Sequence, residues 1–322
     1  GAYTSSSGST QYTVANNGTM RIGVGVGPYL GINVALQAPT LTGAGVFLNP
    51  TGIANAASAA PFTAGISPGE FIVIYGTNLA SGTTVATSVP FPSILGGVQV
   101  AVNGIPAPLY YVSATQIAVI VPYGITSAIA QIQVTNNSVV SNLVTELVNK
   151  TTPGIFTLSQ DGLGYGAIEH ASDGSVVSTT RPAQPGEAVS IFLSGLGPVL
   201  PANLEGTPGP TPALSYTTNT INAYVDGVAA KVGYAGLAPY LAGLYQMNII
   251  IPTTITAGDH IVSIGGPDSY ASQALISTGA ATAAATSAAP AALARLKRAG
   301  RQASFTPTTP CFVIDPACPA AR

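Results

Sequence analysis

An internal repeat constrains the fold of this chain more than any other feature. Residues 97–122 read GVQVAVNGIPAPLYYVSATQIAVIVP, and the pattern returns at residues 219–252 as NTINAYVDGVAAKVGYAGLAPYLAGLYQMNIIIP. In both copies an alternating apolar strand runs into Asn103-Gly104 or Asp226-Gly227, the dipeptides that most strongly indicate a β-hairpin. Each copy closes with a strand that carries a glutamine six residues before a proline. The chain is therefore predicted to contain two related β-domains in tandem.

The match extends upstream, where Pro-Gly-Glu precedes an apolar strand at both Glu70 and Glu187. Short strands separated by Gly, Pro, Asn and Ser turns, without helical periodicity, predict an all-β fold of tandem immunoglobulin-like β-sandwiches. We expect four segments: a β-rich N-terminal arm or domain remnant at 1–48, the first sandwich at 49–150, the second at 151–278, and an alanine-rich basic tail at 279–322.

Two insertions enlarge the second domain. One is the proline-rich stretch at 197–216, and the other is AGLAPYLAGLY at 235–245. Long connections with this much Pro and Gly are ordered only if they pack against something, and a binding surface is most expected there.

Composition limits the partners of the chain. Charged residues make up 6% of it and the formal net charge is -2, whereas about a quarter of the residues of typical soluble domains are charged. Nucleic-acid binding needs clustered Lys and Arg, so no nucleic-acid partner is expected. The sequence contains no uninterrupted stretch of about 20 apolar residues, so no transmembrane helix is predicted. The first residue is Gly and not Met, which indicates a processed chain whose signal peptide, if it had one, has been removed.

The two cysteines, Cys311 and Cys318, stand close together near the C-terminal end. A disulfide closing a short loop is the prediction for an oxidising compartment, with two unpaired thiols as the alternative. Metal binding is not expected, because only His170 and His260 are available to complete a site.

The N-terminal segment is a candidate assembly arm. Glycines alternate with valines there, so one face of the strand would carry no side chains. Such a face either allows another backbone to approach closely or simply makes the strand flexible. Low-complexity ends stay ordered only when something ties them down, and a strand lent to the next copy would build a head-to-tail polymer. The candidate arm residues are Val24, Val26, Tyr29, Ile32 and Val34.

No pattern of catalytic residues is found. Glu70 and Glu187 resemble a glycosidase carboxylate pair, but as repeat equivalents they should lie in different domains, so a role in the turn is favoured. His170 could act as a general base beside Glu169. Successive strand residues point to opposite faces, however, so these two side chains should not face each other. Nucleophile-elbow, zinc-protease and calcium-loop motifs do not occur. We therefore expect no enzyme activity, cofactor or metal.

Three tyrosines near the repeated hairpins are candidate exposed contacts, Tyr110, Tyr111 and Tyr240. Exposed rings could stack on sugars or line a protein contact, whereas buried rings would fill the core and hydrogen-bond at their tips.

A set of ordered blocks resembles a known family. YGTNLASG, VNGIPAPLYYVSATQIAVIVP, TPGIFTL and RPAQPGEAVSIFLSGLGPV resemble the uncharacterised C-terminal domain of secreted proteins from Solibacter and other Acidobacteria, and the first repeat resembles the IPT/TIG immunoglobulin-like fold. The likeness covers about residues 50–276 and implies export to the bacterial surface or exterior, with no activity attached. The basic tail departs from that family, whose members end at the second sandwich.

Two hypotheses of function follow. The first is a secreted structural protein, a subunit of an extracellular filament, sheath or surface layer whose partner is a copy of itself. The alternative is a carbohydrate- or surface-binding adhesion module of a larger exported protein, with glycans as partners.

Overall fold

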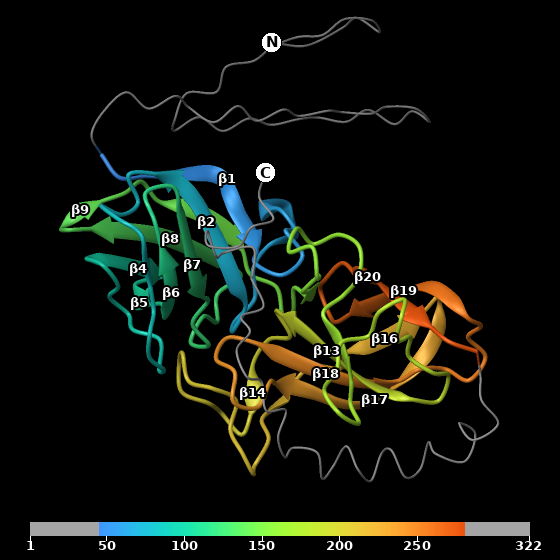
Figure 1. Cartoon of the computed structure of the whole chain (residues 1–322). Coiled ribbons are helices and arrows are strands. Elements are labelled where there is room, and N and C mark those ends of the chain that lie inside the picture. The colour runs from blue at the N-terminus through green and yellow to red at the C-terminus, as the bar shows by residue number, and fades with distance from the viewer. Residues whose placement is uncertain (1–44, 281–322) are drawn as a thin grey trace, which may run out of the picture. The chain divides into compact units, whose positions relative to one another are not determined.

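The computed structural model describes residues 45–280, which form an all-β protein, as predicted (Figure 1). The one helical element in this range is a 3-10 turn, η1 (Phe62–Ala64). The described residues include no helix with the length and apolar character that a membrane span requires. Several candidates fall outside the described residues: Val24, Val26, Tyr29, Ile32, Val34, Cys311 and Cys318.

The first domain is a sandwich of two antiparallel sheets. One sheet has the order β1 (Phe47–Asn55), β2 (Phe71–Thr77), β7 (Gln116–Ile120), β6 (Leu109–Val112), β3 (Thr84–Val85). The other has the order β10 (Val144–Leu147), β8 (Ile129–Asn136), β4 (Val98–Val102), β5 (Ile105–Pro106), with β9 (Val139–Val140) beside β8. Their inner faces share one apolar core, to which β2 contributes Ile72 and Ile74 and β4 contributes Val100.

The second domain is a single sheet that continues through seven strands. Its order is β11 (Gly154–Ile155), β13 (Ala188–Ser194), β18 (Tyr245–Ile250), β17 (Val228–Leu237), β16 (Asn222–Val225), β19 (Gly258–Gly265), β20 (Ser272–Thr278). Off this path, β12 (Ile168–His170) pairs with β13, and β14 (Val199–Leu200) pairs with β15 (Tyr216–Thr217) next to β17. The strands enclose a second apolar core, which contains Val189, Met247 and Val262.

Prolines explain why the two domains differ in sheet continuity. The first half of β17 pairs with β16 and its second half pairs with β18, so this strand joins the two halves of the sheet. In the first domain Pro106 and Pro108 occupy the equivalent stretch, where a missing N–H interrupts the strand ladder. That stretch is accordingly divided into β5 and β6, and its two sheets stay separate.

The repeated hairpins form as predicted. Val102 pairs with Ile105 across the first turn, and Val225 pairs with Val228 across the second. Both turn residues have positive φ in each copy, 50° and 78° at Asn103-Gly104 and 47° and 77° at Asp226-Gly227, as a two-residue type I′ turn requires.

The two domains meet at a packed junction. An apolar cluster joins the outer face of the first sheet, which presents Phe71 and Ile120, to Phe156 and Leu244 of the second domain. The buried N–H of Phe71 donates to Ser194 Oγ at 2.7 Å across the same contact. The connection between the domains is therefore a buried contact surface, and no free linker separates the two sandwiches.

Both insertions contribute to this junction. Phe91 N donates to Gly206 O at 2.9 Å, and Tyr123 N donates to Glu205 Oε1 at 2.7 Å. A Cβ at Gly243 would lie 2.9 Å from Ile120. Part of the surface that was expected to bind a partner thus packs against the chain's own first domain, which is how connections so rich in Pro and Gly become ordered.

Candidate functional site

The Pro-Gly-Glu motif forms the same carboxylate cap in each domain. Glu70 Oε2 accepts a hydrogen bond from Ser67 N at 2.7 Å, and Glu187 Oε2 accepts one from Gln184 N at 2.8 Å. The glycine between them has a φ of 78° in the first motif and 83° in the second, a conformation that favours glycine. These contacts support the turn role that was favoured over a catalytic pair.

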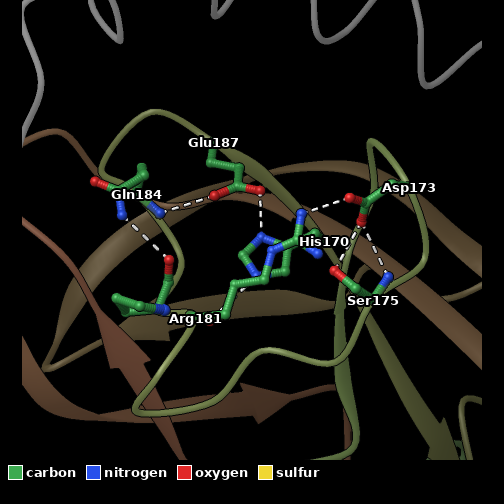
Figure 2. A network of polar contacts seen from close by, with 7 residues as sticks. His170, Asp173, Ser175, Arg181, Gln184 and Glu187 are labelled. Atoms are coloured by element: carbon green, nitrogen blue, oxygen red, sulfur yellow. Dashed lines mark hydrogen bonds and ion pairs between the residues drawn. The ribbon is translucent and has the colours of Figure 1, made fainter.

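The second carboxylate oxygen recruits a partner from the preceding strand. Glu70 Oε1 accepts from Asn55 Nδ2 at 2.8 Å, and Glu187 Oε1 lies 2.6 Å from His170 Nδ1 (Figure 2). Asn55 pairs with Ile72, which lies two residues after Glu70. His170 pairs with Val189, which lies two residues after Glu187. Asn55 and His170 are therefore repeat equivalents. Sequence reasoning missed this because nothing in the local sequence links the two strands.

His170 belongs to a wider polar network (Figure 2). Its Nε2 lies 3.2 Å from Arg181 O, and the Arg181 guanidinium pairs with Asp173. Asp173 Oδ1 also accepts from Ser175 N and Ser175 Oγ. Both ring nitrogens of His170 are therefore engaged by groups of the protein itself, and the residue is buried.

His260 is arranged in the same way. Its Nδ1 lies 2.6 Å from Asp226 Oδ2 and its Nε2 lies 2.9 Å from Thr256 O. Both histidines therefore hold turns and strands together in this structure. Within residues 45–280, no three His, Cys, Asp or Glu side chains are grouped closely enough to hold a metal ion.

The carboxyl of Glu70 is buried where the domains meet. Burial raises its pKa to about 8, although hydrogen bonds from Thr152, Ser67 and Asn55 act in the opposite direction. Thr152 lies in the connection between the domains, and its hydroxyl donates to Glu70 Oε2. Glu146 is buried as well, and burial raises its pKa to about 8. Its Oε1 atom has no hydrogen-bond partner among the described residues.

A cavity of about 200 Å³ opens above this cluster, and we call it the seam cavity. Its floor carries Asn55, Glu70 and Thr152, and residues from both domains form its walls. Tyr270 also lines it and is 82% exposed. Within the described part of the chain, no lysine, arginine or histidine lines the cavity. Sequence reasoning did not identify Tyr270, because it lies outside the repeated hairpins.

Of the three candidate contact tyrosines, Tyr240 is 55% exposed, whereas Tyr111 is buried. The expectation of an exposed Tyr111 is wrong, because this residue belongs to the apolar cluster of the junction. The half-buried Tyr110 packs its ring against Phe71 and Phe91, with centroids 5.7 and 5.4 Å apart. Alternation along the strand could not reveal that a second domain covers the outer face of this sheet.

Comparison with known proteins finds likeness in fold alone. No family model matches the chain, and no curated protein matches it. Among solved structures, the Escherichia coli adhesin FdeC is 12% identical with a TM-score of 0.23, over 77% of this chain and 67% of FdeC. A tandem of titin Ig domains is 8% identical with a TM-score of 0.19, over 66% of this chain and 88% of that chain.

SGBP-B from a xyloglucan utilization locus in Bacteroides uniformis is 10% identical with a TM-score of 0.21, over 72% of this chain and 48% of that chain. Other matches are much longer proteins. The chain spans 16% of the plexin A4 extracellular region and 27% of the gamma-CGTase of alkalophilic Bacillus clarkii. These likenesses concern the fold alone and carry no information about activity.

Proposed function

We propose that this chain is a non-catalytic attachment module of the bacterial exterior, which binds a surface component such as a polysaccharide. The observation that carries the proposal is the packed junction. Phe71, Ile120 and Leu244 lie in one cluster shared by both domains, so the loops of the two sandwiches are held in a fixed arrangement. A contact surface that is ordered before binding loses less entropy on association. The resemblance to an exported domain family supports the extracellular location.

The exposed parts of the two insertions form the candidate contact, which we call the insertion surface. Its exposed apolar residues are Leu200, Leu204, Tyr216 and Tyr240. Glu205 is the only charged residue in 197–216 and 235–245, and its Oε1 is already engaged by Tyr123 N. A neutral surface of this kind suits an uncharged partner, since it offers no counter-charge to an ionic one.

The backbone at Tyr240 supports a contact role. Leu241 N donates to Ala238 O at 3.2 Å, which closes a turn with Pro239 and Tyr240 at its centre. Tyr240 has a φ of 66°, where such a turn prefers Gly or Asn. A side chain in the left-handed region costs about 1–2 kcal/mol, and strain of this kind is concentrated at functional sites. An exposed tyrosine kept at this position fits a residue that serves binding.

A filament subunit remains the second candidate function. Two edges of the described sheets are covered by the chain itself, which excludes them as sites for strand exchange between copies. Asn142 covers the edge of β1 by accepting from Leu48 N at 2.8 Å and donating to Leu48 O at 3.0 Å. Gly166 N donates to Leu275 O, and Leu275 N donates to Gly164 O, so a loop covers β20. Neither of these two edges is open to a strand from another copy. A filament would then form through other strand edges or through the terminal segments 1–44 and 281–322, which are of low-complexity composition.

Binding of the purified full chain to arrays of bacterial surface polysaccharides tests the attachment proposal. Tyr240→Ala should weaken binding by about tenfold, as loss of an aromatic anchor does. Tyr224→Ala is the matched control, because Tyr224 is a 40% exposed tyrosine on β16 and lies outside the insertions. Chain that binds no surface component and forms regular filaments in negative-stain electron microscopy would contradict the proposal and favour the filament subunit. Cleavage of a bound polysaccharide would contradict its non-catalytic character.

A further inference from the structure

We infer that the seam cavity binds one neutral sugar unit. The inference rests on the proposed attachment function, for which it names a ligand class and a second contact site. The cavity is a built feature, since its floor is a hydrogen-bonded cluster: Asn55 Nδ2 donates both to Glu70 Oε1 at 2.8 Å and to Thr152 O at 3.0 Å. The floor therefore keeps its shape without a ligand.

The rim of the cavity is also fixed in place. Thr151 Oγ1 donates to Pro267 O at 2.8 Å and lies 3.1 Å from Ser269 Oγ. A Cβ at Gly266 would lie 2.5 Å from the same Thr151 hydroxyl, so this loop sits tightly against the connection between the domains. Tyr270 follows directly in the loop and is thereby held at the cavity with its ring open to solvent.

Two hydroxyl groups in the cavity wall have hydrogens to donate. Ser272 Oγ accepts from Ile155 N at 3.0 Å, and Ser58 Oγ accepts from Ala60 N at 3.3 Å. Neither hydroxyl hydrogen has an acceptor among residues 45–280. Ser272 is only 8% exposed, so bulk solvent has little access to its side chain. Both hydroxyl oxygens already accept a hydrogen bond, so what each can offer a ligand is its hydrogen, for which a ligand oxygen would be the acceptor.

The charges around the cavity point to a neutral ligand. Among residues 45–280 no cationic side chain lines it, so an anion would find no counter-charge from this part of the chain. Glu70 is its one acid, and this carboxyl already faces protein donors from Asn55, Ser67 and Thr152. Lys150 and Asp268 pair with each other at 3.6 Å and do not line the cavity.

The dimensions select a single ring. A volume of about 200 Å³ is below the range of about 300–1,000 Å³ found for drug-sized ligands. Hydroxyl groups of one sugar unit would reach Ser58 and Ser272, while the exposed Tyr270 ring offers an apolar face to the C–H side of a neighbouring unit. A polysaccharide would thus place one unit in the cavity and the next against Tyr270.

Calorimetric titration of the full chain with glucose, galactose, mannose and their short oligomers tests the inference. Glucosamine and glucuronate serve as charged counterparts. At least one neutral sugar should bind, and Tyr270→Ala or the cavity-filling Ala64→Leu should weaken binding by about tenfold or more. Ala64 lines the cavity and is only half-buried, so leucine can be accommodated there. Tyr224→Ala should bind like the native chain.

Three outcomes would overturn the inference. They are binding of the charged sugars alone, undiminished binding by both Tyr270→Ala and Ala64→Leu, and no binding of any monosaccharide or oligomer. The attachment proposal can be judged separately. If polysaccharide binding weakens in Tyr240→Ala but not in the two cavity variants, attachment through the insertion surface is supported and sugar binding in the seam cavity is refuted.

Discussion

Replacing Glu70 by glutamine should change how the stability of the protein depends on pH. Burial raises the pKa of Glu70 from 4.5 to about 8, so the folded chain holds this proton more tightly than the unfolded chain does. The resulting stabilisation is complete below pH 4.5 and is lost as pH rises through about 8. The span corresponds to on the order of 5 kcal/mol, which is comparable to the whole stability of a typical domain.

Glutamine carries no titrating proton, so the Glu70→Gln variant lacks this dependence. The variant also loses about 1 kcal/mol of stability at low pH. In either orientation of the glutamine amide, its nitrogen would lie against a hydrogen-bond donor from which it cannot accept. Those donors are Asn55 Nδ2 on one side and Ser67 N on the other. We therefore expect the variant to be less stable than the native chain near pH 4.5 and more stable above pH 8, with the two profiles crossing between these values.

Urea denaturation of both chains at intervals from pH 4 to 9 measures the difference profile. Burial also raises the pKa of Glu146 to about 8 and that of Glu169 to about 7. Both residues stay in the variant, so the difference profile reports Glu70 together with its electrostatic coupling to Glu146. Ser58→Ala is the control, because it changes the same cavity without a titrating group and its difference should not depend on pH. Parallel profiles for Glu70→Gln and the native chain would refute the reasoning and mean that Glu70 is already ionised in the folded protein at neutral pH.

Two further outcomes are expected from the junction and the strained turn. Phe71→Ala should lower the free energy of unfolding by about 3–5 kcal/mol, since Phe71 is 2% exposed between the domains; calorimetry measures this, and a loss below about 1 kcal/mol would mean that the junction is not well packed. Tyr240→Gly should raise the free energy of unfolding by about 1 kcal/mol, because glycine adopts a φ of 66° without strain; a lower midpoint in thermal denaturation would contradict this.

Local sequence determined the repeat, the fold class, the hairpins and the turns of this protein. Asn103-Gly104 and Asp226-Gly227 specify their turns because few dipeptides accept two positive φ values in succession. The Pro-Gly-Glu caps are equally local, since the carboxylate of Glu70 reaches back only three residues. Such features depend on neighbours in the chain and can be read without the rest of the molecule.

Tertiary structure alone decided what covers each surface. The apolar run that contains Phe71 predicts burial on both faces of its strand, but its partner Ser194 lies 123 positions away, and no periodicity identifies a partner at that distance. The same contact buries Tyr111, turns the insertions into part of the junction and forms the seam cavity beside Tyr270. Alternation along a strand reports that a side chain is covered, whereas the identity of the covering group depends on how the two domains pack.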